Sequence, residues 1–468
     1  MRIDAEHRAE LVAICGADHV RDDEATLRRY SSDQVAEERY AAAPEVVVLP
    51  ANAREVAAVV KLANRHRIPV TPRGGGSGLS GGAVPVRGGI VLALGRMNRI
   101  VEIDDMNMVA VVEPGVVTRD LDRALEPHGL FFAGYPMSEE LCQIGGNVAE
   151  NAGGGRAVKY GVTGTYVIGM EVVLPTGELV ELGGKRLKDV TGYDLLSLIV
   201  GSEGTLGVIT RITLRLLPRP AVRAALVAFL SDEQVAVTAG IEVLRDPGLQ
   251  PSAVEFVDSV CVDLMRDEPP LLTIPASPCA LMLVELDGGD AAVVERRLER
   301  LEAALAPHSR SIESEIDPAG VARLWDVRKK VPWILKRRSP HQTMEDVSVP
   351  VSTIAELVAA TRELAYRYKI RIANFGHLGD GNIHTTPLKP PEMDVPTWHD
   401  LLAELLPELY RRVVALGGTI SGEHGIGHKR REYVPIALGS DAIAASRRVR
   451  HALDPNGIMN PGKMWPEG

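Results

Sequence analysis

The chain has 468 residues, of which 52 are basic and 62 acidic, giving a net charge of −10. At roughly 150 residues per domain, this length predicts two to four structural units. The acidic balance argues against nucleic acid and against an anionic membrane surface as partners, because both require clustered Lys and Arg. No apolar run approaches the ~18 residues of a membrane span.

The N-terminus and the cysteines bear on the cellular compartment. Residues 1–7 are charged from the start and lack the apolar segment of a signal peptide. The four cysteines lie far apart and form no CxxC motif. This excludes a disulfide framework, a four-cysteine zinc site and an iron–sulfur cluster built from this chain alone. These features predict a cytoplasmic protein, which a partner could hold at the membrane periphery.

Short strands and amphipathic helices are predicted for the first half of the chain. In the helix expected at 52–66, Val56, Val59 and Val60 share one face and Asn52 is a plausible cap. Strands at 45–50 and 68–71 flank it, which predicts a βαβ-like opening. The other elements expected here are helices at 4–15 and 116–128, strands at 90–94, 99–103, 108–112 and 207–217, and a hairpin at 168–182.

Glycine density falls beyond Pro218-Arg-Pro220, which predicts a domain boundary. We therefore expect a first domain over 1–220, a second over 221–427, and a turn-rich segment, 428–468, that packs back on the first. Within the second domain, strands and helices are expected to alternate over 221–315. Helices are then expected at 321–336 and 351–368, with strands near 346–350 and 371–385.

The loop Gly76-Ser-Gly78-Leu-Ser-Gly81 matches the GxGxxG pattern of dinucleotide-binding proteins. That interpretation requires the loop to open a helix. Residues 81–89 contain four glycines and a proline and cannot hold one. The loop is therefore predicted to join strand to strand. Its successive glycines still let backbone N–H groups converge on a phosphate, and Ser77 and Ser80 add hydroxyl donors.

A pair of histidines is predicted on one hairpin. Asp380-Gly381 is a strong two-residue turn signal, and in that register His377 lies directly opposite His384. Their Cβ atoms would be ~5 Å apart, close enough for both imidazoles to bind one divalent ion. Glu423 is the candidate third ligand, and such a set suits Zn²⁺, Mn²⁺ or Fe²⁺. The alternative is a pair of hydrogen-bonded histidines without metal.

Glu423 and His424 follow a turn-forming Ser-Gly pair. In extended chain, adjacent side chains point to opposite sides. Glu423 could then bind the ion while His424 faces a substrate. The alternative is a solvated, charged loop.

Five ordered motifs, at 73–82, 144–154, 201–207, 376–384 and 421–427, carry a resemblance to a known family. They resemble those of the FAD-linked 2-hydroxy-acid dehydrogenases and oxidases of the vanillyl-alcohol oxidase superfamily, the p-cresol methylhydroxylase-type (PCMH-type) flavoproteins. The likeness is in particular to the flavin subunit of glycolate oxidase and to FAD-dependent D-lactate dehydrogenases. It implies an α+β fold, with a two-subdomain PCMH-type FAD-binding domain and an α+β substrate or cap domain containing an antiparallel sheet.

The resemblance implies that the first motif cradles the FAD pyrophosphate and that the next two line the rest of the cofactor. Relatives that bind flavin covalently use a histidine where this chain has Ser77, so noncovalent FAD is expected. Residues 133–136 depart from the Pro-Asp-Pro-like turn of many relatives. The residues placed along the cofactor are Arg73, Gly74, Gly75, Gly76, Ser77, Gly78, Leu79, Ser80, Pro136, Ser138, Gly145, Gly146, Asn151, Gly154, Glu203, Gly204, Gly207, Val208, Ile209 and Asn460.

The same resemblance implies catalytic roles. His377, His384 and Glu423 would hold zinc, or a similar ion such as manganese or iron, and His424 would act as general base. Arg328 would grip the substrate carboxylate, a bidentate task suited to guanidinium. On composition alone, the basic stretch around Arg328 would be a solvated helix start.

The expected activity is metal-assisted hydride transfer from a small D-2-hydroxy acid to FAD. Relatives that oxidise 2-hydroxyglutarate carry a threonine and a lysine where this chain has Pro332 and Met344. This disfavours a dicarboxylate and favours lactate or glycolate. The electrons would pass to an electron-transfer flavoprotein, an iron–sulfur subunit or a quinone, and a homodimer is compatible with the sequence. The alternatives are a non-redox flavin-adduct transferase of the same fold and a non-catalytic flavin subunit of a larger oxidase.

Overall fold

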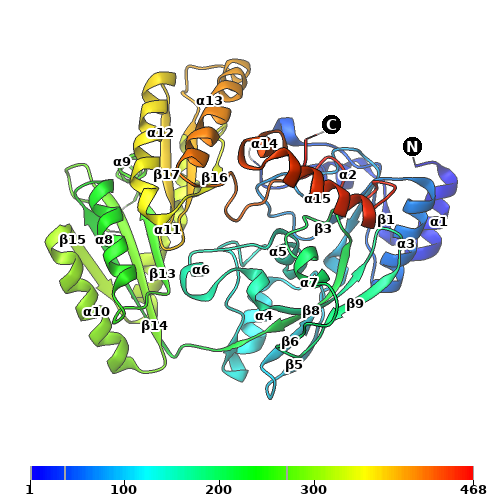
Figure 1. Ribbon diagram of the computed structural model, residues 1–468, viewed down its shortest axis with the longest axis horizontal. Coiled ribbons are helices and arrows are strands. Elements are labelled where there is room, and N and C mark those ends of the chain that lie inside the picture. Colours follow the sequence, from blue (N-terminus) through cyan, green and yellow to red (C-terminus); the bar gives the residue numbers. More distant parts are fainter. Residues whose placement is uncertain (1–2, 36–37, 270–271, 467–468) are drawn as a thin grey trace. The chain divides into compact units, whose positions relative to one another are not determined.

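A computed structural model describes residues 3–35, 38–269 and 272–466 (Figure 1). The chain divides into two compact units. Unit 1 comprises residues 1–153, 162–218 and 423–468, and unit 2 comprises residues 154–161 and 219–422. The chain therefore passes between the units four times.

A mixed four-stranded sheet, in the order β1-β2-β4-β3, lies in unit 1. Strands β2 (Val46–Val48) and β3 (Val70–Arg73) both run parallel to β4 (Ile90–Ala93) and flank it. Helix α3 (Ala53–His66) connects β2 to β3 and begins where the Asn52 side chain accepts hydrogen bonds from the N–H groups of residues 54 and 55. The predicted βαβ opening is confirmed.

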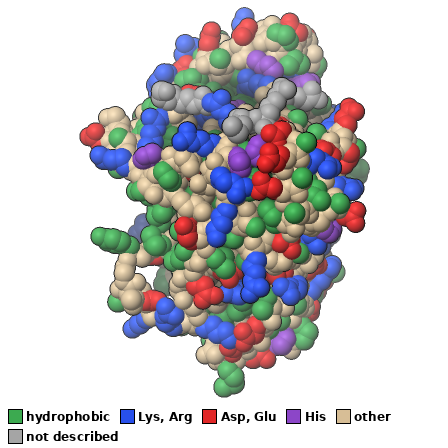
Figure 2. Space-filling model, turned by 90° about the vertical axis from the view of Figure 1, so that its right-hand side faces the viewer, with side chains coloured by type: hydrophobic (Ala, Val, Ile, Leu, Met, Phe, Trp, Pro, Cys, Tyr) green, Lys and Arg blue, Asp and Glu red, His purple; other side chains and the backbone are tan. Residues whose placement is uncertain are grey.

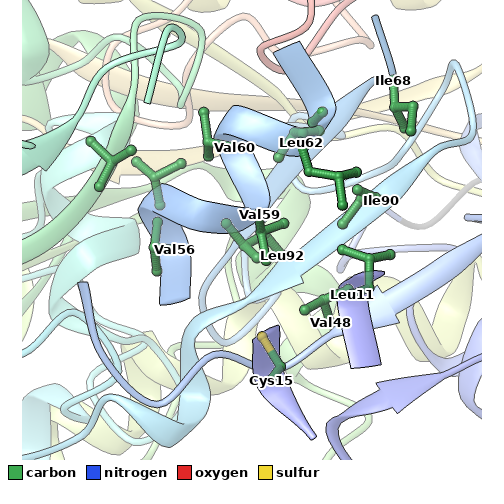
Figure 3. Close-up of a cluster of buried hydrophobic side chains, with 14 of the residues drawn as sticks. Leu11, Cys15, Val48, Val56, Val59, Val60, Leu62, Ile68, Ile90 and Leu92 are labelled. Atoms are coloured by element: carbon green, nitrogen blue, oxygen red, sulfur yellow. The ribbon is translucent and has the colours of Figure 1, made fainter. Parts of the chain in front are cut away.

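One hydrophobic cluster holds α1 (Ala5–Cys15), α3 and this sheet together (Figure 3). Val56, Val59 and Val60 of α3 are fully buried, as their helical spacing predicts. They pack with Ile90 and Leu92 of β4 in the same cluster. Strand β3, which leads into the glycine-rich loop, therefore packs on this buried core through Val70.

Unit 1 also contains an antiparallel five-stranded sheet, β5-β6-β10-β8-β9, and a two-stranded one, β11-β7. The remaining helices of unit 1 are α1 (Ala5–Cys15), α2 (Glu24–Arg29), α4 (Thr118–Leu125), α5 (Ile144–Glu150), α7 (Leu195–Ile199), α14 (Val434–Ala437) and α15 (Ser440–Leu453). Its remaining strands are β1 (Val20–Arg21), β5 (Ile100–Asp104), β6 (Val109–Val112), β7 (Leu130–Phe131), β8 (Val167–Val173), β9 (Leu179–Gly183), β10 (Val208–Arg215) and β11 (Leu217–Pro218).

Unit 2 is built on a seven-stranded antiparallel sheet in the order β15-β12-β14-β13-β17-β18-β16. The strands are β12 (Val222–Leu230), β13 (Ala253–Val257), β14 (Ala280–Gly288), β15 (Ser309–Glu315), β16 (Glu345–Ser348), β17 (Arg371–His377) and β18 (Asn382–Leu388). The helices are α6 (Ala157–Tyr160), α8 (Glu233–Arg245), α9 (Ser259–Met265), α10 (Ala291–Leu305), α11 (Pro318–Arg338), α12 (Ile354–Tyr368) and α13 (Val395–Ala415). The expected mixed helix–sheet fold with an antiparallel sheet is confirmed.

Helices α11 and α12 cover opposite faces of this sheet. On β17, Asn374 donates a hydrogen bond to Thr361 of α12. The next residue, Phe375, lies under the guanidinium of Arg328 on α11, 4.8 Å from the ring centroid. Successive residues of a strand point to opposite faces, so the side chains of Phe375 and His377 share the face covered by α11.

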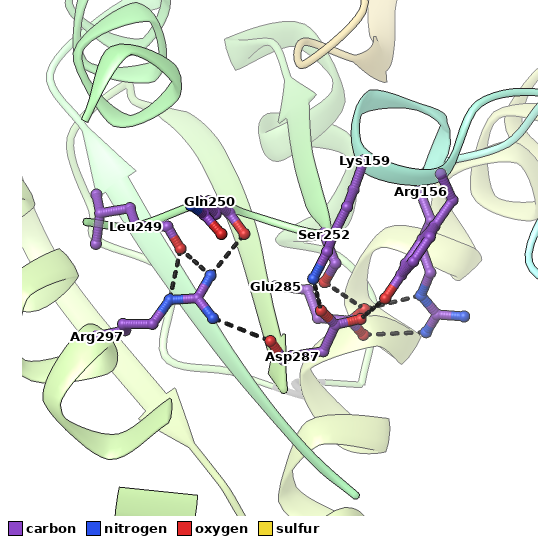
Figure 4. Close-up of polar contacts among 9 residues, drawn as sticks. Arg156, Lys159, Leu249, Gln250, Ser252, Glu285, Asp287 and Arg297 are labelled. Carbon is purple, nitrogen blue, oxygen red and sulfur yellow. Dashed lines mark hydrogen bonds and ion pairs between the residues drawn. The ribbon is translucent and has the colours of Figure 1, made fainter. Parts of the chain in front are cut away.

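The short segment 154–161, which includes α6, is anchored to the same sheet face by ion pairs (Figure 4). Arg156 donates to both carboxylate oxygens of Glu285, at 2.8 and 3.0 Å. Lys159 and Tyr160 both contact the carboxylate of Asp287. Glu285 and Asp287 on β14 are buried, so the segment satisfies two carboxylates that would be costly to leave unpaired.

Three further features concern the surface charges, the cysteines and the apolar character of the helices. Figure 2 shows Lys and Arg side chains interspersed with Asp and Glu on the face drawn there. All four cysteines are free thiols and buried. Among the described residues, no helix combines the length and the apolar character needed to cross a membrane.

Candidate functional site

The glycine-rich loop of unit 1 joins β3 to β4, as predicted, and opens no helix. Arg73, at its start, is buried and folds beneath the loop. Its Nη1 donates to the carbonyl oxygens of Ser32 (2.8 Å) and Ala83 (3.3 Å). Burial lowers the pKa of Arg73, and nearby Asp33 opposes that shift. Gly76 has a φ of +68°, and a Cβ there would collide with the Arg73 guanidinium, so this position requires glycine.

The C-terminal segment connects the glycine-rich loop to the third predicted flavin motif, at residues 201–207, by hydrogen bonds. The Nδ2 of Asn460 donates to the carbonyl oxygens of Gly82 (2.9 Å) and Glu203 (2.7 Å). Lys463 is buried beside it and donates to the carbonyl of Val84 at 2.5 Å. Burial lowers the pKa of Lys463 to about 7, although the neighbouring Glu203 raises it.

The side chain of Glu203 binds the loop at residues 425–427. Its two oxygens accept hydrogen bonds from the N–H groups of Ile426 and Gly427, each at 2.7 Å. Burial raises the pKa of Glu203, and these two N–H groups oppose the shift. Burial also raises the pKa of Glu150, and the Glu203 carboxylate adds to the effect. Glu203 therefore holds the 425–427 loop within unit 1.

Buried polar atoms around the loop fit a bound polar ligand. Ser80 Oγ and Gln143 Oε1 are buried and have no hydrogen-bond partner within the residues that the structure describes. A Cβ on Gly74 would lie 3.4 Å from Gln143 Oε1 and 3.6 Å from the backbone nitrogen of Gly146. The bare backbone of Gly74 and Gly146, from the first two motifs, thus lies beside the unsatisfied amide oxygen of Gln143, as a phosphate cradle requires.

The other residues expected along the cofactor are placed as follows. Ser77, Gly78, Leu79, Pro136, Gly146 and Asn151 are half-buried, and Gly75 and Ser138 are exposed. Asn151 also accepts a hydrogen bond from the N–H of Gly164 at 2.8 Å. Gly154 belongs to unit 2, at the start of the 154–161 segment. Gly154 is buried, as are Gly145, Gly204, Gly207, Val208 and Ile209.

The histidine hairpin has a different register from the one predicted. His377 pairs with Asn382, and His384 pairs with Phe375, so four residues rather than two form the loop. The backbone N–H groups of residues 380 and 381 both approach the carbonyl oxygen of His377, which closes a wider turn, and Gly381 adopts a φ of +86°. The predicted direct pairing of the histidines is therefore wrong. They remain diagonal neighbours on one face, with ring centroids 5.4 Å apart.

A buried glutamate joins His377 to Arg328. Glu255 on β13 pairs directly with His377 on β17. Its Oε1 lies 2.6 Å from His377 Nδ1, and its Oε2 lies 2.7 Å from Arg328 Nε. Burial alone would raise the pKa of Glu255, but His377 and Arg328 together hold it below the ordinary value. The carboxylate is thus ionised and bridges two of the predicted site residues.

Arg328 itself is buried, with 2% of its surface exposed, near the middle of α11. The solvated helix start that composition alone suggested is wrong, because this face of α11 packs on the sheet. Its guanidinium Nη2 is buried without a hydrogen-bond partner among the described residues. A buried cationic donor in this state is costly unless a ligand satisfies it.

Asp346 is a second buried acid beside the hairpin. It pairs with His384 across β16 and β18, and its Oδ1 lies 3.7 Å from His384 Nδ1. Its Oδ2 accepts hydrogen bonds from Ser421 Oγ (2.8 Å) and from the N–H of Gly422 (2.9 Å). Asp346 therefore fixes the turn that immediately precedes Glu423.

Glu423 and His424 do not point apart. They lie in a series of bends rather than in extended chain, and His424 Nε2 is 3.7 Å from Glu423 Oε1. The predicted opposite orientation is therefore wrong. Within unit 1, Glu423 lies against Gly153, where a Cβ would be 3.1 Å from its carboxylate.

Two buried acidic residues beside the histidine hairpin, Glu255 and Asp346, were missed in the sequence analysis. Each is an acidic residue in a short strand: Glu255 lies within the otherwise apolar stretch 253–257, and Asp346 lies within 345–349, where Val347 and Val349 are buried. Acidic residues are rarely buried unless they are paired. That pattern is the signal that could have identified them.

Comparison with known proteins gives a consistent result. Residues 44–183 match the family described as "FAD binding domain". Residues 219–464 match the family described as "FAD linked oxidases, C-terminal domain". The glycolate oxidase subunit GlcD of Bacillus subtilis (strain 168) is 37% identical over 463 residues, covering 98% of this chain and 96% of that protein. A D-lactate dehydrogenase of Anaerostipes hadrus is 37% identical over 433 residues, covering 90% of each.

A solved structure of p-cresol methylhydroxylase with substrate bound is also similar. It superimposes with a TM-score of 0.78 at 18% identity, covering 97% of this chain and 95% of that one. This likeness concerns the fold, and it agrees with the PCMH-type architecture expected from the motifs.

Proposed function

Because the chain belongs to the family of FAD-linked oxidases, we propose that it oxidises a small D-2-hydroxy acid of the lactate or glycolate class to the 2-oxo acid. One observation carries the substrate assignment. Arg328 and His377 are held side by side by the two oxygens of Glu255. A 2-hydroxy acid carries its carboxylate and its hydroxyl on adjacent carbons, so it presents groups suited to both.

Arg328 supplies the carboxylate recognition. Its Nε forms an ion pair with Glu255 and its flat face lies on Phe375, while Nη2 has no hydrogen-bond partner among the described residues. A guanidinium held in this way has little rotational freedom left to lose on binding an anion. The substrate carboxylate would satisfy the buried donor at Nη2.

The remaining residues fit the expected cofactors. The loop from Arg73 to Ser80, with Gln143 and Asn460, would hold noncovalent FAD, and His377, His384 and Glu423 would hold a zinc, manganese or iron ion. When bound, FAD supplies the hydride acceptor and the metal ion supplies a positive charge that lowers the pKa of the 2-hydroxyl. The carboxylates next to both histidines are the usual partners of metal-binding imidazoles.

His424 would remove the hydroxyl proton as general base. Loss of that proton together with the hydride on C2 converts the alcohol carbon into the carbonyl carbon of the 2-oxo acid, so charge and atoms balance. Glu203 contributes indirectly, because it holds the backbone of residues 426 and 427 next to His424.

The sequence and the relatives support the proposed substrate class, and the cysteines bear on the electron acceptor. Pro332 and Met344 offer no charge for a second carboxylate, which favours a monocarboxylate. Relatives named glycolate oxidase and D-lactate dehydrogenase support the same class. With all four cysteines buried and free, the electrons would pass to an electron-transfer flavoprotein, an iron–sulfur subunit or a quinone.

The direct test is an assay of the purified chain with an artificial electron acceptor and a panel of D- and L-2-hydroxy acids. We expect turnover of D-lactate or glycolate with formation of one 2-oxo acid per two electrons. Turnover of the chain alone would exclude a non-catalytic subunit. Formation of a stable flavin adduct without acceptor reduction would instead indicate a transferase.

A further inference from the structure

We infer that Glu255 is a positioning residue that sets the tautomer of His377 and so presents its Nε2 to the metal ion. The inference deepens the proposed function and rests on it. It concerns a residue that contacts neither substrate nor ion and acts through His377.

The geometry of the contact defines the tautomer. A carboxylate only accepts hydrogen bonds, so at 2.6 Å the Nδ1 of His377 must carry its hydrogen toward Glu255. In neutral imidazole the lone pair is then on Nε2. Second-shell carboxylates commonly fix the tautomer and the ring orientation of metal-binding histidines in this way.

Glu255 needs both carboxylate oxygens to accept from His377 and Arg328 at the same time. Both of its partners are donors, and an arginine cannot exchange its donor for an acceptor. A glutamine at this position would have one oxygen and one NH₂ to offer. Its oxygen would pair with Arg328, and its NH₂ would face His377 Nδ1. His377 would then move its hydrogen to Nε2, the nitrogen required for the metal.

Glu285 provides a matched comparison in the same sheet. Residues 253 and 255 lie on the same face of β13, and Glu285 pairs with Ala253, so the two glutamates are diagonal neighbours. Both are fully buried. Glu285 binds Arg156, Ser252 Oγ (2.9 Å) and Trp325 Nε1 (2.8 Å). None of these described contacts of Glu285 involves a predicted metal ligand.

The experiment compares Glu255→Gln and Glu285→Gln in the full-length flavoprotein. Zn²⁺ affinity is measured by competition with a chromogenic chelator, and flavin absorbance and melting temperature report folding. The tautomer is read by ¹⁵N NMR of metal-free protein labelled in histidine, with His377 assigned by difference from His377→Gln. We expect Glu255→Gln to move the His377 hydrogen to Nε2 and to weaken Zn²⁺ binding roughly 10–100-fold.

The KM for substrate should change little in this variant, because the side-chain oxygen of the glutamine still accepts from Arg328.

Glu285→Gln should lower the melting temperature but leave the tautomer and the Zn²⁺ affinity unchanged. If Glu255→Gln does not fold, Gly155→Ala replaces it, because a Cβ there would lie 2.8 Å from Glu255 Oε1 and displace the carboxylate. An unchanged His377 tautomer in a folded variant would overturn the inference. A tautomer change in a protein that binds no Zn²⁺ would support the positioning role and would count against the metal part of the proposed function.

Discussion

Asp346 and His384 pair across β16 and β18, and the same aspartate binds the two residues that precede Glu423. One buried carboxylate therefore connects a predicted metal-binding strand to the turn that leads into the predicted third ligand. Asn382, on the same hairpin, adds a hydrogen bond to Asp346 at 2.7 Å.

We expect Asp346→Asn to reduce turnover and metal content by roughly 10–100-fold, as for other groups that orient metal ligands. Ser421, the N–H of Gly422 and Asn382 all donate to the carboxylate, so an amide would place its NH₂ against one of them. The measurement is kcat together with metal content by mass spectrometry. Ser421→Ala, which removes only one of the donors, is the control and should have a small effect. Equal activities for both variants would contradict this role of Asp346.

His377→Ala should abolish metal binding and turnover while the protein keeps its yellow flavin. The reason is that His377 lies in unit 2, whereas the loop from residue 73 to residue 80 lies in unit 1. The measurement combines metal analysis, the flavin spectrum and activity. His341→Ala, at an exposed position of unit 2, is the control. Full turnover in His377→Ala would refute the metal role.

Arg328→Lys should raise the KM for the 2-hydroxy acid by roughly 10–100-fold, which corresponds to the loss of one charge-assisted hydrogen bond. Lysine keeps the positive charge opposite Glu255 but has no planar fork. Steady-state kinetics would show whether KM rises more than kcat falls. Arg337→Lys, on an exposed part of the same helix, should behave as wild type. An unchanged KM would mean that another group binds the carboxylate.

Glu285 should make the unfolding of unit 2 sensitive to acid. Burial alone would raise the pKa of Glu285, but Arg156 and its other donors lower it to about 2 from the ordinary 4.5. Because the folded-state pKa is the lower one, the stabilisation is present above pH 4.5 and is lost as the pH falls toward 2. For a fully buried group, a shift of this size corresponds to a few kcal/mol.

Glu285→Gln should therefore be less stable than wild type at pH 6, and the difference should shrink at pH 3. Trp325 donates to Glu285, so tryptophan fluorescence during urea unfolding is a suitable probe. Asp246→Asn, which breaks an exposed pair with Arg300, is the control and should show little change. A pH-independent difference would show that the pair does not titrate as described.

The sequence predicted helices and strands more reliably than it predicted strand register and tertiary contacts. Helix α3 was predictable because its apolar spacing and its Asn52 cap are local signals. The hairpin register was not, because Asp380-Gly381 also fits a wider turn, and only the neighbouring strands decide between the two. Likewise, the burial of Arg328 depends on Glu255, which lies 73 residues away in the chain and across the sheet.

The most direct test of the central claim is an anaerobic titration of the purified flavoprotein with D-lactate and glycolate, before and after removal of metal by a chelator. The account predicts that the flavin absorbance bleaches with one equivalent of substrate, that the chelated protein stays oxidised, and that Zn²⁺ or Mn²⁺ restores the bleaching. A flavin that remains oxidised with every 2-hydroxy acid, or that is reduced equally well without metal, would contradict it.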